Sequence, residues 1–146
     1  MAALKATRTS QRPLVATFVW NFDDTMLDTG GVSKDFGATN TASTVFEVIN
    51  LPVGAIVIGG SVVTETAFDA ATYTVSIGDS GSATRYLGAT DVKGAGRTAL
   101  VPTGYRNTGG LNLRATVVPA DACTTGKLTL LVEYIIDGKS EEVTPV

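Results

Sequence analysis

The segment Gly78-Asp79-Ser80-Gly81 has the residue order that surrounds a serine nucleophile in some hydrolases. Such a serine needs a histidine as its general base, and the chain contains no histidine. Histidine and cysteine are also the usual zinc ligands, and Cys123 is the single cysteine. We therefore interpret residues 78–81 as a glycine-serine turn that follows a strand.

Two further segments place glycine beside a basic residue, as phosphate-binding loops do. Asp137-Gly138-Lys139-Ser140 ends like such a loop, but Glu133 occupies the position where the pattern requires an earlier glycine. Gly94-Ala95-Gly96-Arg97 lacks the strand-helix unit that surrounds a dinucleotide fingerprint. Neither segment predicts nucleotide binding.

Carboxylates are the remaining candidates for chemistry. Four aspartates fall in one polar stretch, Asp23, Asp24, Asp28 and Asp35. Their spacing lacks the alternation and the closing glutamate of an EF-hand calcium loop, so we interpret them as solvated loop acids. Three glutamates lie on predicted strands, Glu47, Glu65 and Glu133, where outward-facing strand positions explain them more simply than a glycosidase pair does. We expect no enzyme activity, no cofactor and no metal.

The composition points away from several classes of protein. Only 17% of residues are charged, 44% are hydrophobic and the formal net charge is −3, so no basic footprint indicates nucleic-acid binding. One cysteine excludes an intramolecular disulfide. The first residues lack the apolar core of a signal peptide, and the longest apolar run, 53–63, is shorter than the roughly 20 residues of a membrane helix.

Residues 44–68 are predicted to be the central part of the fold. Two runs rich in valine, isoleucine, threonine and phenylalanine flank Pro52-Val53-Gly54, which predicts two strands joined by a short corner. Ile56 and Ile58 make the second run apolar on both faces, as in a strand covered by a facing sheet and by a loop or partner. Gly59-Gly60 predicts a bulge or a close backbone approach.

The rest of the chain contains further strands and one long polar loop, over 23–42. Alternation of apolar and polar residues predicts strands at 14–22, 73–77, 111–117 and 127–136, of which 73–77 is expected to be half-exposed. Weaker strands are predicted at 83–87 and 98–101, and a helical turn at 90–93. Seven or eight short strands without a long helix predict an all-β, antiparallel two-sheet sandwich that is jelly-roll-like. The predicted domains are a short extended N-terminal arm (1–13), a single β-sandwich (14–140) and a C-terminal tail (141–146).

Four motifs, taken in order, resemble small head proteins of tailed bacteriophages. They are Leu51-Pro52-Val53-Gly54-Ala55-Ile56-Val57, Thr74-Val75-Ser76-Ile77-Gly78-Asp79, Ala89-Thr90-Asp91-Val92-Lys93 and Leu131-Val132-Glu133-Tyr134-Ile135-Ile136-Asp137-Gly138-Lys139. The chain resembles a capsid cement, or decoration, protein of the jelly-roll kind over about 44–140. This resemblance implies a non-enzymatic virion protein, made in the host cytoplasm, that sits on the outer surface of the phage capsid.

The same resemblance implies two partners, the major capsid protein and a second copy of the chain. A homodimer is favoured, a trimer is the alternative, and neither a membrane nor nucleic acid is expected to bind directly. The basic arm carries Lys5, Arg8 and Arg12 without an acid. The candidate residues for shell or subunit contact are Lys5, Arg8, Arg12, Ile56, Ile58, Tyr86, Tyr105 and Arg106.

Two other functions remain open at this stage. Jelly rolls also serve as lectins, so the chain could be a carbohydrate-binding or receptor-binding module of a phage tail. Tyr86, Tyr105, Arg106 and Asn107 would then form the sugar site. A structural protein of the tail or neck would share the same composition.

Overall fold

The computed structural model describes residues 12–137, and all of their regular structure is β. The predicted arm residues Lys5 and Arg8 and the predicted tail lie outside the described residues. The strands are β1 (Leu14–Asn21), β2 (Thr25–Leu27), β3 (Ser33–Asp35), β4 (Thr44–Ile49), β5 (Ala55–Thr66), β6 (Tyr73–Gly78), β7 (Leu87–Asp91), β8 (Gly96–Ala99), β9 (Arg106–Asn107), β10 (Leu113–Pro119) and β11 (Lys127–Ile136).

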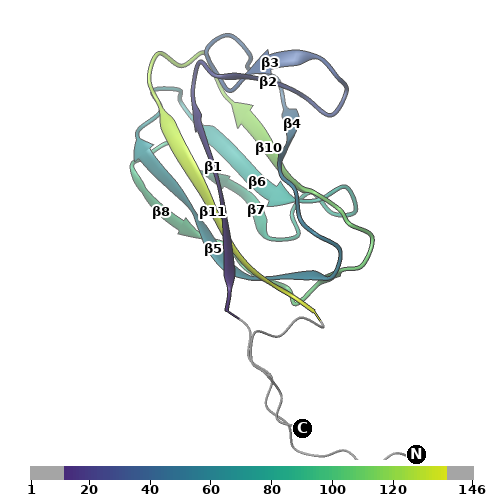
Figure 1. Cartoon of the computed structure of the whole chain (residues 1–146). Helices are drawn as coiled ribbons and strands as arrows, with labels where there is room; N and C mark the ends of the chain where they lie inside the picture. The colour runs from purple at the N-terminus through teal and green to yellow at the C-terminus, as the bar shows by residue number, and fades with distance from the viewer. Residues whose placement is uncertain (1–11, 138–146) are drawn as a thin grey trace, which may run out of the picture.

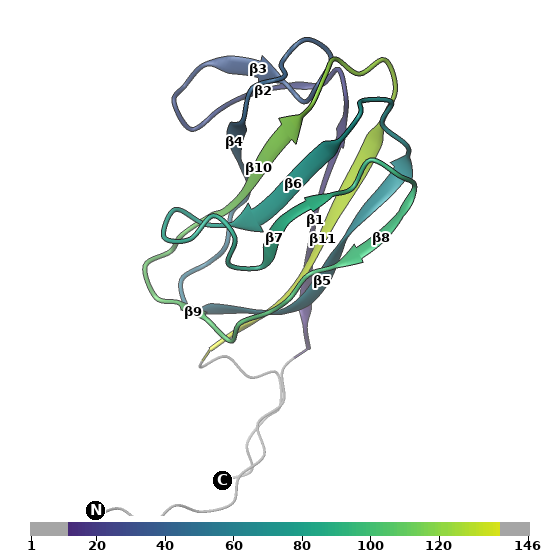
Figure 2. The same cartoon turned by 180° about the vertical axis from the view of Figure 1, so that it is seen from behind.

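Nine of the strands form two antiparallel sheets that face one another, and β2 and β3 form a separate hairpin (Figures 1 and 2). One sheet has the order β1-β11-β5-β8, with β9 also paired to β5, and the other has the order β4-β10-β6-β7. Eight strands remain when the β2–β3 hairpin and β9 are left out. Numbered from 1 to 8 in chain order, they give the order 1-8-3-6 in one sheet and 2-7-4-5 in the other. This is the strand order of a jelly roll, so the predicted fold class is confirmed.

The core lies between the sheets because alternate residues of each strand point inward. β10 shows the pattern clearly, since Leu113, Ala115 and Val117 are buried while the residues between them are partly exposed. β11 contributes Leu128, Leu130 and Val132 in the same way, and it lies between β1 and β5 as a strand deep in its sheet. Burying such rows of aliphatic side chains is the main stabilising contribution to a sandwich of this kind.

An aromatic cluster connects the two sheets near one end of the core. Phe36 stacks between Trp20 of β1 and Phe46 of β4, with ring centroids 5.0 and 4.2 Å away. The indole Nε1–H of Trp20 donates to the hydroxyl of Tyr73 (3.0 Å), and that hydroxyl donates to the carbonyl of Phe36 (2.6 Å). All of these side chains are buried, so each polar group in the cluster has its hydrogen bond inside the protein.

The segment predicted as one long loop, 23–42, contains the β2–β3 hairpin instead. Sequence reasoning missed the hairpin because its strands have three residues each and alternate too briefly to give a pattern. Its position is fixed by Phe36, which lies directly after β3 and is buried in the aromatic cluster. Phe36 thus anchors a mostly polar segment to the core, and Met26 packs against the core beside it.

β5 bends where the sequence predicted. Ile58 is an extra residue in the ladder, because Glu133 pairs with Gly59 whereas Tyr134 pairs with Val57. A Cβ atom at Gly60 would lie 2.2 Å from the carbonyl oxygen of Leu131, so only glycine fits this close approach. The predicted corner at Pro52 carries the chain from one sheet to the other.

Three smaller predictions were wrong. Residues 90–93 are not a helical turn, because Thr90 and Asp91 belong to β7, which pairs with β6. The weak strand predicted at 83–87 begins only at Leu87. β6 is not half-exposed, since Ser76 on its outward face is buried between β10 and β7. A small side chain between two neighbouring strands is covered by their larger residues.

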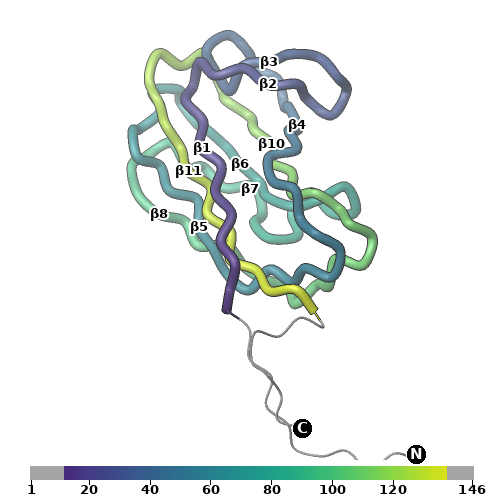
Figure 3. Tube along the Cα trace, in the orientation of Figure 1, coloured from purple at the N-terminus to yellow at the C-terminus, as the bar shows by residue number. Residues whose placement is uncertain are grey.

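The strand directions give the sandwich two distinct ends. β1 begins opposite the end of β11, because Leu14 pairs with Tyr134, so the described chain enters and leaves at one end (Figure 3). We call this the terminal end; it also holds the β4–β5 corner and β9. The β2–β3 hairpin lies at the opposite end, which we call the hairpin end (Figure 1).

Replacing Tyr73 with phenylalanine tests the aromatic cluster. The variant removes one hydroxyl and leaves the Trp20 indole N–H and the Phe36 carbonyl buried without partners, so it should lower the free energy of unfolding by about 1–3 kcal/mol. The measurement is urea unfolding followed by tryptophan fluorescence. Tyr134→Phe, at a partly exposed site, is the control and should change stability by less than about 0.5 kcal/mol. Equal effects of the two variants would contradict the account of the cluster.

Candidate functional site

The segment that resembles a serine nucleophile loop is held as a turn. The carboxylate of Asp79 accepts the backbone N–H groups of Gly81 and Ser82 and forms an ion pair with Arg85, Nε to Oδ2 2.7 Å. Its hydrogen-bonding capacity is therefore used for structure.

No cluster of metal-ligating side chains occurs in residues 12–137. That part of the chain also contains no helix that could span a membrane.

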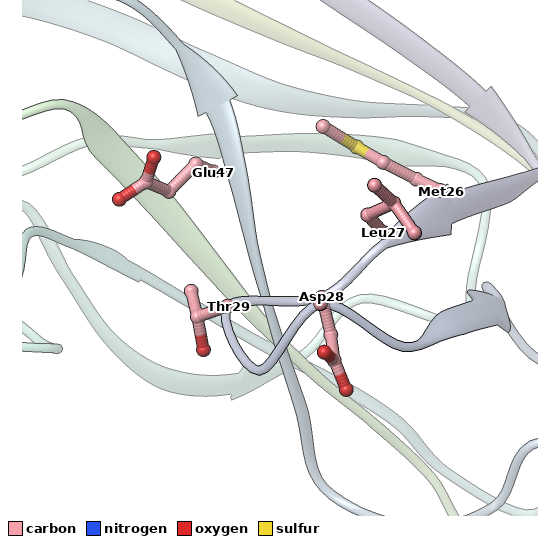
Figure 4. A pocket seen from close by; sticks show the side chains of 6 residues that line it. Met26, Leu27, Asp28, Thr29 and Glu47 are labelled. Carbon is pink, nitrogen blue, oxygen red and sulfur yellow. The ribbon is translucent and has the colours of Figure 1, made fainter.

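A shallow hollow of about 390 Å³ lies beside the β2–β3 hairpin, lined by Met26, Leu27, Asp28, Thr29, Gly31 and Glu47. Figure 4 shows that the carboxylates of Asp28 and Glu47 point away from one another. Asp28 accepts the N–H groups of Gly30 and Val32, and Glu47 accepts Arg114, Nη2 to Oε1 2.8 Å. The hollow therefore has two carboxylates at its rim, and both already have partners.

These partners lower the pKa values of both groups. The backbone N–H of Val32 lowers the pKa of Asp28, and the Arg114 guanidinium lowers the pKa of Glu47. A catalytic acid needs a raised pKa near the working pH, and neither carboxylate has one. The hollow thus offers no acid–base pair. The loop acids Asp28 and Asp35, which were predicted to be solvated, accept hydrogen bonds from backbone N–H groups instead.

Asp35 shows how the acids hold the hairpin. Its carboxylate is partly desolvated, which raises its pKa, but hydrogen bonds from Thr39 and from the backbone N–H groups of Gly37, Thr39 and Asn40 outweigh this and lower the pKa to about 2. The charged form is therefore the one that the loop after β3 binds. Asp35 fixes the turn that directs Phe36 into the core.

The outer face of the β1-β11-β5 sheet carries little charge. Val15, Val19 and Ile58 are exposed by 58%, 47% and 41%. Glu133 is exposed on β11 between Val15 and Gly59, and it forms no ion pair with the rest of residues 12–137. A flat face with several exposed aliphatic side chains is typical of a contact surface. Ile56, the other predicted residue of this strand, is partly buried beside Arg106.

The terminal end presents a second set of exposed groups. Val53 is 66% exposed at the β4–β5 corner, and its side chain lies against Gly110. Arg106 forms an exposed ion pair with Asp137, Nη2 to Oδ2 2.6 Å. Arg12 is exposed where the described chain begins. This end therefore combines an apolar side chain with cations, close to where the predicted basic arm joins the domain.

The predicted sugar-site residues do not form an open platform. Tyr86 is 1% exposed, and burial raises the pKa of its hydroxyl to about 12, so its ring is not available at the surface. Asn107 is also buried, where its amide bonds the backbone of Leu111. The guanidinium of Arg85 covers one face of the Tyr105 ring at 3.6 Å. Tyr86 was predicted to be a contact residue because it is an aromatic residue in a glycine-rich segment. Such a segment gives no sequence signal that the side chain is buried.

Sequence reasoning did not single out Val15, Val19 or Val53 as surface residues. The alternation of β1 held the signal for two of them, because it placed Phe18 and Trp20 inward and so Val15 and Val19 outward. No comparable signal existed for Val53. The Asp79–Arg85 and Glu47–Arg114 pairs depend on loop and strand geometry that no local pattern specifies.

No protein-family model and no curated protein matches the chain. Three solved structures, all of phage capsids, contain a chain with this fold. A chain in the capsid asymmetric unit of cyanophage Pam1 is 25% identical, with TM-score 0.62, over 93% of this chain and 92% of that one. A chain in the acid-stable capsid of Helicobacter pylori bacteriophage KHP30 is 20% identical, with TM-score 0.63, over 93% and 96%.

The third chain, from the capsid of Ralstonia phage GP4, is 15% identical, with TM-score 0.54, over 95% of this chain and 93% of that one. At 20% and 15% identity the second and third likenesses show the fold alone. The predicted resemblance to phage capsid components is confirmed by the Pam1 likeness, which spans 93% of this chain.

Replacing Asp35 with asparagine tests the role of this carboxylate. The pKa of Asp35 is lowered from 3.8 to about 2, so its stabilising contribution is present above pH 3.8 and is lost as the pH falls through about 2. Asp35→Asn should lower the free energy of unfolding at neutral pH by about 1–2 kcal/mol. It should also reduce the amount by which the free energy of unfolding falls when the pH is lowered. Urea unfolding at several pH values measures both effects, with the exposed Asp23→Asn as control. An unchanged pH profile in Asp35→Asn would contradict this assignment.

Proposed function

We propose that this chain is a cement, or decoration, protein of a phage head. It binds the outside of the shell, bridges neighbouring major capsid subunits and stabilises the shell against the pressure of packaged DNA. The observation that carries the proposal is the likeness of the whole jelly roll to chains in phage capsid structures, one of them 25% identical over 93% of this chain. A non-enzymatic role is consistent with the occupied carboxylates of the hairpin hollow.

The stabilising effect follows from multiple contacts on one lattice. A protein that spans two capsomers must lose one of its contacts before they separate, so its contact free energy adds to the free energy of rupture. If each copy adds a few kcal/mol, roughly the value of a modest interface, many copies make the shell much harder to open. Such a role requires complementary surfaces and no reactive group.

We assign the shell contact to the terminal end and to the predicted basic arm. Val53 is highly exposed there, and Arg106 and Arg12 supply positive charge at the surface. Lys5 and Arg8 would extend this basic surface. Exposed aliphatic and arginine side chains are the types that interfaces favour, whereas the β2–β3 hairpin at the other end is dominated by aspartates engaged in turns.

The tail-module alternative has weaker support from the surface. Its aromatic candidate Tyr86 and its polar candidate Asn107 are buried, so of the four predicted residues only part of the Tyr105 ring and the ion-paired Arg106 are accessible to a sugar. A structural role in the tail or neck differs from the cement role in where the protein is located. Binding to purified heads and tails measures that difference.

Co-sedimentation with purified particles tests the proposal. Full-length protein is mixed with expanded phage heads stripped of decoration, and with tails as the control. We expect saturable binding to heads near one copy per major capsid subunit and none to tails. Binding to tails, or to neither particle, would refute the cement function.

Charge substitutions at the two ends test where the shell contact lies. Val53→Asp with Arg106→Glu should weaken binding to heads by about tenfold or more, because it removes an exposed aliphatic contact and reverses a charge. Leu27→Asp with Lys34→Glu is the matched control at the hairpin end, where Leu27 is 62% exposed and Lys34 pairs with Asp28. The control should bind like the unmodified protein. Stronger loss in the control would place the shell contact at the hairpin end.

A further inference from the structure

β1 is an outer strand, and one of its backbone edges faces away from its sheet (Figure 1). The β1–β11 register continues to Phe22, whose N–H donates to the carbonyl of Gly126. Since hydrogen-bonded pairs alternate along an antiparallel ladder, the even residues of β1 bond β11 and the odd residues point outward. The N–H and C=O groups of Val15, Thr17 and Val19 therefore lie along the free edge.

Nothing within residues 12–137 covers this edge between Val15 and Val19. Within the described part of the chain, the backbone groups of these three residues make no hydrogen bond on that side. The edge ends at Asn21, whose N–H and carbonyl are occupied by Asp24. On the neighbouring outer strand β4, by contrast, the carbonyl of Val45 accepts the N–H of Thr29.

The strand also lacks the features that usually protect a free edge. β1 contains no charged residue and no proline, and its ladder with β11 has no bulge. Exposed edges of monomeric proteins are normally blocked by one of these features, because an unblocked edge pairs with another strand. The edge of β1 is thus suited to pairing.

We propose that β1 pairs antiparallel with β1 of a second copy, in a register centred on Thr17. In this register Thr17 lies opposite Thr17 of the second copy, and Val15 lies opposite Val19. Each of these pairs exchanges N–H and C=O bonds, so every free group on both edges is satisfied. The two copies then share one continuous sheet about a two-fold axis, which adds a defined contact to the proposed function.

The side chains on the outer face match in this arrangement. The outward positions of β1 are Val15, Thr17 and Val19, all exposed in the single chain. The pairing makes two valine-valine pairs and one central threonine-threonine pair across the junction. Aliphatic pairs and threonine pairs directly opposite one another are favourable in antiparallel sheets.

The inward side chains also fit. Leu14, which is 39% exposed, would lie opposite Trp20 of the other copy. Beside the free edge at Trp20 is a hollow of about 380 Å³, lined mainly by Phe18, Trp20, Met26 and Phe36. The register therefore brings an exposed leucine over an apolar hollow, twice per dimer by symmetry.

The charges at the ends of the strand are complementary. β1 is preceded by Arg12 and followed by Asp23 and Asp24. Antiparallel pairing brings the basic start of one strand beside the acidic end of the other, at both ends of the junction. A parallel arrangement would place like charges together instead, which is unfavourable.

The oligomeric state of the free protein tests this pairing without any phage head. Sedimentation equilibrium of the full-length chain should show a dimer. Val15→Lys with Val19→Lys should raise the dissociation constant by at least about tenfold, because charged side chains would meet at both valine pairs. Ile58→Lys is the control: it alters an exposed aliphatic residue on β5, away from the junction, and should leave the dimer intact.

Cysteine cross-linking tests the register. Under oxidation Thr17→Cys should give a covalent dimer, because residues in a hydrogen-bonded antiparallel pair have Cα atoms about 5.5 Å apart, within disulfide range. Val15→Cys alone should not cross-link, since its two copies would lie roughly 13 Å apart. Cys123 is buried, and burial raises its pKa, so the unmodified protein is a low-background control.

Three results would overturn the pairing: a monomeric unmodified protein, a dimer that survives both lysines, or cross-linking by Val15→Cys in place of Thr17→Cys. A dimer that survives both lysines would place the contact between copies on another surface, and cross-linking by Val15→Cys would indicate a different register. Head binding is a separate measurement, so either hypothesis can fail while the other holds.

Discussion

The hydrogen bonds that run from Trp20 through Tyr73 to the carbonyl of Phe36 constrain the rest of this structure. They join β1 of one sheet to β6 of the other and fix the residue that anchors the β2–β3 hairpin. Without that anchor, residues 23–42 would be a long polar loop with little apolar surface to bury. Because Phe36 is held between Trp20 and Phe46, the hairpin has a defined place beside the free edge of β1.

The jelly-roll order distributes the contact surfaces of the molecule. Both ends of the described chain lie at the terminal end with Val53 and Arg106, whereas the hairpin lies at the other end. The outer strand β1 is left at one side with an uncharged edge. One surface is thus suited to the shell and another to a second copy. In the proposed antiparallel pairing the terminal ends of the two copies lie at opposite ends of the dimer, so one terminal end of each dimer meets the shell. This division suits a protein that bridges subunits by contact alone.

The long alternating strands could be predicted from sequence because period-two burial is a local signal. β11 was predicted with its observed bounds, and the bulge at Ile58 and Gly59 followed from a glycine pair in an aliphatic run. The β2–β3 hairpin was missed because its strands are too short to show a period. The burial of Ser76 and Tyr86 was missed because it depends on residues distant in sequence. Three of the candidate contact residues lie at the surface, namely Ile58, Arg106 and Arg12. The free edge of β1 could not be predicted, because it depends on the order of the strands in the sheet.

The central claim is that this chain decorates the outside of a phage head, and cryo-electron microscopy of expanded heads incubated with the purified protein tests it most directly. The account predicts added density on the outer surface, above the junctions between capsomers, into which the jelly roll fits with its terminal end toward the shell. Added density on the inner surface, or a map unchanged at saturating protein, would contradict it.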